Sequence, residues 1–256
     1  MLTNAIIKRV VSLKNKKFRQ QYNCFVVEGR KMTEEALKSK FEVLEIFALN
    51  SWIDKNKNLL SAANTSYSAP QVYAVSEKEL TKMSSLVNAD SVICVIKQKE
   101  VKSIETNKKF VIALDNINNP GNLGTIIRLA AWFGIKDIVC SMDTVECYNP
   151  KVIQSTMGAI FHTNIIYTDL KKFIEQHYSN NIYGTLPEGG KNIYTEELAK
   201  EGIIIIGSES HGISKEIQQI VTNPITIPSF AINDAVESLN ASIACGIILS
   251  EFRRRF

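Results

Sequence analysis

Histidine and cysteine are scarce in this chain. Its 256 residues include only three histidines and five cysteines, which are scattered, with no C-x-x-C pair. This pattern offers no ligand set for zinc or iron, so we expect no metal site. An odd number of cysteines fits a reducing compartment, and we therefore expect a cytoplasmic protein.

Long apolar runs are also missing. The chain reaches Lys8 and Arg9 without the apolar segment that signal peptides carry. The isoleucine run 203–206 is far too short to span a bilayer. We therefore expect neither a signal peptide nor a membrane-spanning helix. No repeat or low-complexity tract is visible, and 45% hydrophobic with 22% charged residues is ordinary for a globular protein.

Positive charge is concentrated at the start of the chain. Residues 1–40 hold ten Lys and Arg residues against three Glu, a local charge of +7, whereas the whole chain carries +4. Such a segment favours a polyanion, for example a nucleic acid, as partner. A merely solvated lysine-rich surface is the alternative. The candidates for phosphate contacts are Lys14, Lys16, Lys17 and Arg19.

The first part of the chain, residues 1–97, predicts a small α/β domain. Helices and strands alternate along it, and Ser76 with Glu79 forms a capping-box pattern at a helix start. Residues 98–109 are polar without an apolar period, which predicts a linker. The strands predicted in this domain are 24–27, 43–49, 72–75 and 92–96, with one basic helix before the first strand and another helix over 32–38.

The second part, residues 110–256, predicts an open, mostly parallel sheet. It begins with the wholly apolar strand 110–114, as in a parallel sheet buried on both faces. The segments between its strands are long enough for crossover helices. The further strands predicted are 137–140, 163–167, 181–185, 203–206 and 225–227, and the last helix is predicted from Leu239 to Phe252.

A polar loop, 118–124, follows the first strand of this sheet. It matches neither the dinucleotide fingerprint nor a P-loop, so it predicts no nucleotide site of those kinds. Asn122 is placed to cap the following helix. Arg128 lies about 200° around that helix from the apolar Ile126, counting roughly 100° per residue. Its guanidinium can grip a phosphate bidentately or simply be solvated.

Two further loops also follow predicted strands and carry polar residues. The loop 207–212 follows strand 203–206, and its two glycines allow the backbone to approach a ligand closely. Glu209 would lie at the carboxyl end of a parallel strand, where open α/β sheets bind ligands. The third loop leads from Ile227 to Ser238 and Asn240 at a helix start. Ser238 either caps this helix or faces a ligand at its N-terminus.

Taken in order, the three loops carry N-x-G-x-x-x-R, G-x-E-x-x-G and I-P … S-L-N. This trio resembles the SpoU/TrmH class of the SPOUT superfamily, which methylates ribose 2′-hydroxyls of RNA with S-adenosylmethionine. The resemblance covers residues 110–256 and extends to the pieces 148–151 and 157–161. Residues 1–95 more loosely resemble the N-terminal substrate-binding domain of the family, through 25–30.

The resemblance implies a deep trefoil knot at the C-terminus and a bent S-adenosylmethionine held mainly by backbone. The cofactor-binding positions would be Gly207, Ile227 and Leu239. It also implies catalytic roles. Arg128 would activate the hydroxyl, for example through the adjacent phosphate, Ser238 would orient it, and Asn122 and Asn240 would position the loops and the ribose. Glu209 would hold Asn122 or Arg128.

The expected partners are structured RNA and a second copy of the chain. The two-domain layout favours ribosomal over transfer RNA as substrate. Family members pair through the last helix, placing the arginine of one subunit near the cofactor of the other. In this sequence that helix is apolar on more than one side, which favours an isologous interface. The residues concerned are Leu239, Ile243, Ile247, Ile248 and Phe252.

Two other functions stay open on the residues alone. One is a non-catalytic RNA-binding or ribosome-assembly factor on the same fold, although all the motif residues are present. The other is a methyltransferase acting on a small acceptor, which would leave the charge of residues 1–40 unexplained.

Overall fold

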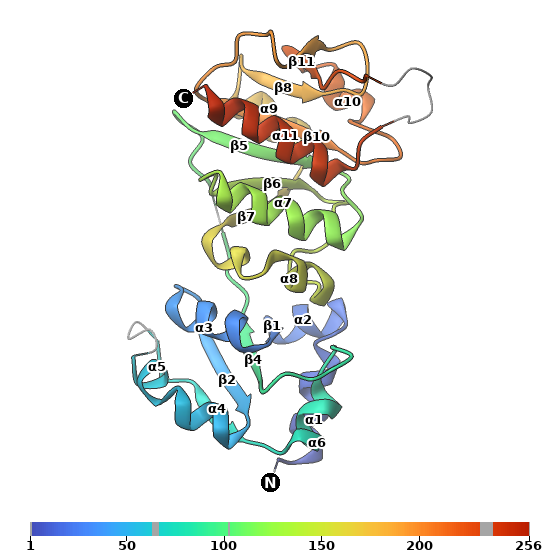
Figure 1. Ribbon diagram of the computed structural model, residues 1–256. Helices are drawn as coiled ribbons and strands as arrows, with labels where there is room; N and C mark the ends of the chain where they lie inside the picture. Colours follow the sequence, from blue (N-terminus) through green and yellow to red (C-terminus); the bar gives the residue numbers. More distant parts are fainter. Residues whose placement is uncertain (1, 63–66, 102, 231–237, 256) are drawn as a thin grey trace. The chain divides into compact units, whose positions relative to one another are not determined.

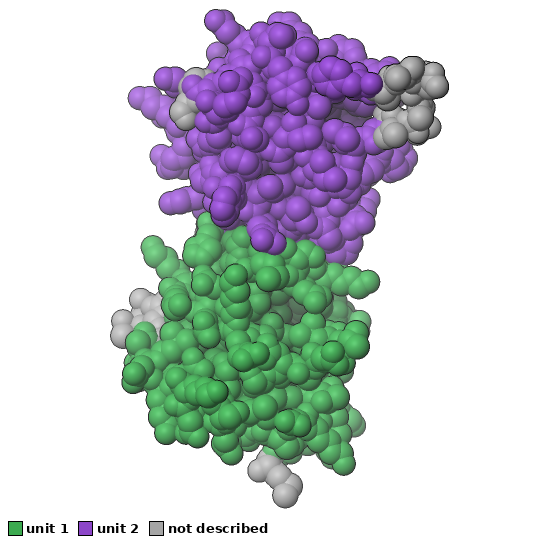
Figure 2. All heavy atoms as spheres, in the orientation of Figure 1, with its two compact units in different colours: residues 1–100, 146–162 green, residues 101–145, 163–256 purple. Residues whose placement is uncertain are grey.

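The computed structural model describes residues 2–62, 67–101, 103–230 and 238–255 (Figure 1). The chain forms two compact units, coloured separately in Figure 2: residues 1–100 with 146–162, and residues 101–145 with 163–256. We call them unit 1 and unit 2. The sequence predicted a single division of the chain, with a linker at 98–109. The structure differs, because residues 146–162 pack with unit 1. None of the described helices is both long and apolar enough to cross a membrane.

Unit 1 is built on a mixed four-stranded sheet in the order β1-β4-β2-β3. The central strand β4 pairs antiparallel with both β1 and β2, whereas β3 lies parallel to β2. Each strand lies within one residue of its predicted bounds. These bounds are β1 Cys24–Glu28, β2 Val43–Ala48, β3 Gln71–Ala74 and β4 Val92–Lys97.

The helices of unit 1 differ from expectation at the start of the chain. The single basic helix predicted there is two helices, because Asn15 adopts an extended conformation between them. The capping box of Ser76 and Glu79 is confirmed at α6. The helices are α1 Asn4–Ser12, α2 Lys16–Tyr22, α3 Arg30–Lys38, α4 Asn50–Lys55, α5 Lys57–Ser61 and α6 Glu77–Met83.

Aromatic packing holds the segment 146–162 in unit 1. The segment contains α8 (Pro150–Thr156) and a 3₁₀ turn at Ala159–His162. The Tyr148 ring stacks on Phe25 at 4.4 Å between centroids, and Phe161 meets the ring of Phe41 edge-on at 5.2 Å. Such contacts between residues more than a hundred positions apart leave no trace in local periodicity.

Unit 2 is built on a seven-stranded sheet in the order β7-β6-β5-β10-β8-β11-β9, and every pairing is parallel. The predicted parallel sheet is therefore confirmed, with the short β9 as an addition. The strands are β5 Phe110–Asp115, β6 Asp137–Ser141, β7 Asn164–Thr168, β8 Ile182–Thr185, β9 Lys191–Asn192, β10 Gly202–Gly207 and β11 Asn223–Thr226.

Helices cover both faces of this sheet (Figure 1). Alternate residues of the central strands, such as Val111 and Ile203, pack in one cluster with residues of α9 (Leu170–His177) and α10 (Lys215–Gln218). The intervening residues point to the other face, which carries α7 (Pro120–Trp132) and α11 (Ala241–Arg254). The sheet is thus buried on both sides, as its continuous apolar strands predicted.

The order of strands places a switch point in the middle of the sheet. After β5 the chain moves outward through β6 and β7, and β10 later pairs with the other side of β5. The carboxyl ends of β5 and β10 meet there, with Asp115 in register with Gly207. Ligands of open α/β sheets bind outside such a point. The trefoil knot stays a prediction, because residues 231–237 on the path from β11 to α11 lie outside the described residues.

Candidate active site

Three polar side chains join the three motif loops at this switch point. Asn122, in the first turns of α7, donates through Nδ2 to Oε1 of Glu209 in the loop after β10. Asn240 donates through its own Nδ2 to Asn122 Oδ1 at 3.1 Å and to Glu209 Oε1 at 3.3 Å. Asn122 is buried. The carboxylate of Glu209 is therefore the shared acceptor of two amides from different helices.

An asparagine caps the N-terminus of α7 and another caps that of α11. At α7 it is not the asparagine that was expected. Asn119 caps α7, since its Oδ1 accepts from the backbone N–H of Gly121 at 2.8 Å. The prediction that Asn122 is the cap is therefore wrong, and its side chain is free to hold Glu209. At α11 the cap is Asn240, which accepts from Ser242 N at 3.0 Å. Ser238 lies two residues earlier and is exposed.

The loop after β10 is folded tightly on itself. Ser208 and Gly212 form an isolated antiparallel bridge, and Gly212 has a φ of +63°. A Cβ on Gly207 would lie 2.1 Å from the carbonyl carbon of Gly212, so only glycine fits there. This close turn presents Glu209 just after the end of β10.

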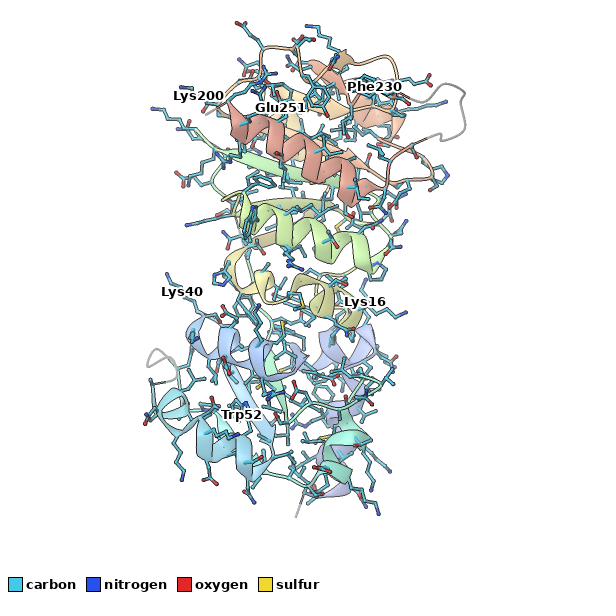
Figure 3. All side chains as sticks on the ribbon, viewed as in Figure 1. Lys16, Lys40, Trp52, Lys200, Phe230 and Glu251 are labelled. Carbon is cyan, nitrogen blue, oxygen red and sulfur yellow. The ribbon has the colours of Figure 1, made fainter. Side chains whose placement is uncertain are left out.

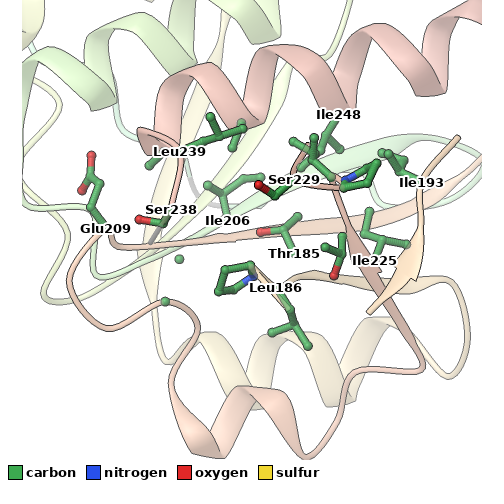
Figure 4. Close-up of a pocket in the computed structure, with 18 of the residues that line it drawn as sticks. Thr185, Leu186, Ile193, Ile206, Glu209, Ile225, Ser229, Ser238, Leu239 and Ile248 are labelled. Atoms are coloured by element: carbon green, nitrogen blue, oxygen red, sulfur yellow. The ribbon is translucent and has the colours of Figure 1, made fainter. Parts of the chain in front are cut away.

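A pocket of about 430 Å³ opens beside this network. In Figure 4, Glu209 and Ser238 lie at one end of it and Ile193 and Ile225 at the other. All three positions expected to bind cofactor line it, and so do Glu209 and Ser238. The lining comes from segments after β8, β10 and β11 and from the start of α11: residues 185–187, 193, 206–209, 212, 225–230, 238–239, 241, 244 and 248.

One wall of the pocket contains none of the residues predicted to bind a ligand. Thr185 ends β8, Leu186 and Pro187 follow it, and Ile193 lies just beyond β9. The available signal was their place after an apolar strand of the parallel sheet, at its carboxyl edge. They carry no charged or amide side chain, so a search for reactive groups passed over them.

Arg128 stands apart from the pocket. It is exposed on α7, as predicted from its helical position, and it is not one of the described residues that line the pocket. The structure therefore brings together Asn122, Glu209 and Asn240 and leaves Arg128 facing outward.

The four cations predicted to contact RNA do not share one environment. Lys14, Lys16 and Lys17 are exposed, and Lys16 is labelled in Figure 3. Arg19 is buried, and its Nη2 lies 2.5 Å from Glu146 Oε2 within unit 1. Its Nη1 also donates to the carbonyls of Leu13 and Lys14. The prediction for Arg19 is therefore wrong, because its guanidinium already has partners inside the protein.

An apolar pocket with a few polar groups, at the switch point of a parallel sheet, is typical of a ligand-binding α/β domain. The SpoU rRNA Methylase family matches residues 109–250 of this chain, and an MRM3-like substrate binding domain matches residues 4–94. The chain belongs to the SpoU rRNA Methylase family. The predicted class, an RNA 2′-O-ribose methyltransferase dependent on S-adenosylmethionine, is thereby confirmed.

Known proteins resemble the chain along its whole length. An uncharacterised tRNA/rRNA methyltransferase of Synechocystis is 29% identical, over 98% of this chain and 92% of that protein. The 23S rRNA (guanosine(2553)-2′-O)-methyltransferase RlmP of Bacillus subtilis is 26% identical, over 98% and 96%. The AdoMet-bound rRNA methyltransferase of Sinorhizobium meliloti is 26% identical, with a TM-score of 0.87 over 100% of this chain and 97% of that one.

Proposed function

We propose that this protein methylates a ribose 2′-hydroxyl of ribosomal RNA, with S-adenosylmethionine bound in the pocket of unit 2. The observation that carries the proposal is the junction of Asn122, Glu209 and Asn240, which fixes all three motif loops at one end of that pocket. Similarity to RlmP, which is named for a 23S rRNA guanosine, favours ribosomal RNA over transfer RNA.

The pocket fits the cofactor in size and in chemistry. Its volume lies within the range of small-molecule sites. Aliphatic side chains such as Ile206 and Leu239 offer apolar contact, and Gly207 contributes backbone to the lining. Gly207, Ile227 and Leu239 would hold the cofactor there, mainly through backbone groups. When bound, S-adenosylmethionine supplies an electrophilic methyl group.

The chain must then bring a ribose oxygen into line and help remove its proton. Ser238 lines the same end of the pocket as Glu209 and would orient the hydroxyl. Asn122 and Asn240 keep the loops in place. Arg128 would contact the phosphate beside the target ribose. Because a guanidinium retains its proton in proteins, we assign it to orienting and charge stabilisation rather than to accepting the proton itself.

An outward-facing Arg128 suits a dimer in which each subunit completes the other's site. Helices α7 and α11 lie side by side, joined at one end by Asn240 and Asn122 and at the other by Arg253, whose Nε donates to Phe133 O at 2.7 Å. Trp132 at the end of α7 and Ile243 at the start of α11 are exposed by 83% and 57%. We define these residues, with Leu239 and Arg128, as the α7/α11 face and propose that it forms an isologous interface.

The α7/α11 face differs from the interface expected from the sequence. Ile248 and Phe252, two of the residues expected at that interface, are buried within unit 2. A Cβ on Gly246 would lie 3.5 Å from the Leu129 side chain of α7. The small residue therefore admits a helix of the same subunit rather than that of a partner.

Unit 1 would hold the RNA. Its exposed cations, including Lys16 and Lys17, are suited to phosphates rather than to reading bases. The five cysteines are buried and none of them is in a disulfide in the described residues, which suits the reducing cytoplasm in which we place the protein.

The test is methyl transfer from tritiated S-adenosylmethionine to 23S rRNA transcribed in vitro, followed by mapping of 2′-O-methyl positions. We expect one labelled ribose with the wild type, and loss of label with Arg128→Ala. Lys136→Ala, which removes another exposed cation of unit 2, is the matched control and should keep full activity. If the wild-type protein transferred no label to the RNA and gave no heat on titration with S-adenosylmethionine, these results would instead support a non-catalytic RNA-binding factor.

A further inference from the structure

We propose that the segment 84–91 of unit 1, with Lys31 beside it, docks an unpaired region of the RNA substrate, where Val87 packs against an unstacked base. This inference rests on the proposed RNA substrate and adds a particular recognition surface to it. The segment joins α6 to β4 (Figure 1). We call it the α6–β4 loop.

Val87 is fully exposed, more so than any other large apolar side chain in the described part of unit 1. A single exposed valine is unremarkable on a surface. In this loop, however, the exposed side chain is carried by a backbone that the rest of unit 1 holds from both ends. An apolar group held away from any partner of its own chain is available to a ligand.

The first end of the loop is held by Glu28 and Lys14. The carboxylate of Glu28 accepts from Ser84 Oγ at 2.5 Å and from the backbone N–H of Ser85 at 2.8 Å. Lys14 Nζ donates to the carbonyl oxygen of Ser84 at 2.7 Å. Lys14 therefore holds the loop itself. Lys16 and Lys17, in contrast, are proposed to contact phosphates only.

The second end is held by Asp90. Its carboxylate accepts from the backbone N–H groups of Ser91 at 2.5 Å and of Arg30 at 3.2 Å, and it lies 3.3 Å from Arg30 Nε. The chain turns into α3 at Gly29, whose φ of +102° is one that glycine tolerates best. Both acids near the loop, Glu28 and Asp90, are thus engaged with its backbone.

Exposed cations lie on the segments that flank the loop. Lys31 follows Arg30 in the chain, Lys82 lies two residues before the loop, and both are exposed. The Arg30 side chain is itself 70% exposed. Cations beside an apolar tip match a phosphate backbone beside an unstacked base. A regular RNA duplex hides its base faces by stacking, whereas loops and bulges expose them. The chemistry therefore favours an irregular RNA element over a duplex.

The test measures binding of wild-type protein and variants to unmodified 23S rRNA transcribed in vitro, at several salt concentrations and without cofactor. Val87→Ser removes the apolar contact, so Kd should rise about tenfold, the equivalent of burying one valine. That factor should be the same at every salt concentration. Lys31→Gln should instead reduce the slope of log K against log salt by about 0.7 to 0.9.

Three controls make these outcomes specific. Val72→Ser changes another exposed valine of unit 1 and should leave Kd unchanged. A fully paired RNA duplex should bind the wild type and Val87→Ser equally. The melting temperature and the affinity for S-adenosylmethionine should be the same in the wild type and in Val87→Ser, because the Val87 side chain is fully exposed.

Equal binding of 23S rRNA by the wild type and Val87→Ser would overturn the inference while leaving the proposed function intact. Equal losses of affinity for the duplex and for 23S rRNA would also overturn it, since the loop would then not distinguish unpaired RNA. A wild type that binds no RNA would instead defeat the proposed function, and the inference with it.

Discussion

Asn122 and Glu209 lie 87 positions apart in the chain and are joined by a hydrogen bond from Nδ2 to Oε1. This bond ties the loop after β5 to the loop after β10, at the point where the strand order of the sheet reverses. Asn240 reaches both partners from the start of α11. Glu209 is therefore the residue through which the three motif loops are coupled.

Removing this shared acceptor should weaken both fold and site. Glu209→Ala leaves the buried amide of Asn122 without its acceptor, which should cost about 1–3 kcal/mol of unfolding free energy. Glu209→Gln keeps one acceptor oxygen and should cost less. Chemical denaturation would measure the loss of stability, and calorimetry would measure the weaker binding of S-adenosylmethionine. Glu216→Ala, an exposed acid of α10, should change neither, and a Glu209→Ala protein as stable as this control would refute the coupling.

Arg19 should behave as a structural residue. Its guanidinium is buried against Glu146, and removing one partner of a buried ion pair costs about 3–5 kcal/mol. Urea unfolding of Arg19→Ala should show this loss, and Lys17→Ala should change stability by less than about 0.5 kcal/mol. If Arg19→Ala kept its stability and lost only RNA affinity, the residue would belong to the RNA surface after all.

Lys16 and Lys17 should contribute to RNA binding through charge alone. Changing both to Gln should lower the slope of log K against log salt by up to about 0.9 for each duplex phosphate that the protein then leaves unneutralised. Cofactor affinity, measured in parallel, should not change. An unchanged slope would remove this part of α2 from the RNA path.

The stability of unit 2 should fall in acid because of Glu251. Hydrogen bonds from Arg254, assisted by Arg255, lower the pKa of this carboxyl to about 2 from 4.5. The side chain is labelled in Figure 3. Because the folded-state pKa is the lower one, the ion pairs stabilise the fold fully above about 4.5 and lose that effect as the pH falls towards 2.

Melting temperatures between pH 7 and pH 2 would test this directly. Glu251→Gln should melt below the wild type at neutral pH, and the difference between the two proteins should shrink steadily below pH 4.5. A constant difference over this range would show that the charge of Glu251 does not provide the stabilisation.

The proposed dimer should depend on Ile243 rather than on Ile248. Ile243→Asp places a charge on the exposed α7/α11 face, so it should yield folded monomers without methyltransferase activity. Ile248 is 2% exposed, so Ile248→Asp should unfold the protein instead of splitting a dimer. Sedimentation and circular dichroism would separate these results. A fully active monomer of Ile243→Asp would show that the site needs no partner.

Much of the fold follows from local pattern. The apolar runs at 110–114 and 203–206 form the central strands of a sheet buried on both faces, because only such a position hides every side chain of the run. The capping box at Ser76 depends on residues three apart, and the structure contains it. The three motif loops could be recognised because each occupies one short stretch after a strand.

Local pattern was therefore enough to predict the kind of element at each place and the three loops that follow strands. The partners of these elements became visible only in the folded chain. Arg19 and Lys17 look alike in sequence, yet Glu146 buries one of them. Residues 146–162 continue unit 2 along the chain, yet they pack with Phe25 and Phe41 of unit 1. Burial and pairing are set by residues far along the chain, whereas periodicity and capping report only on neighbours within a few turns.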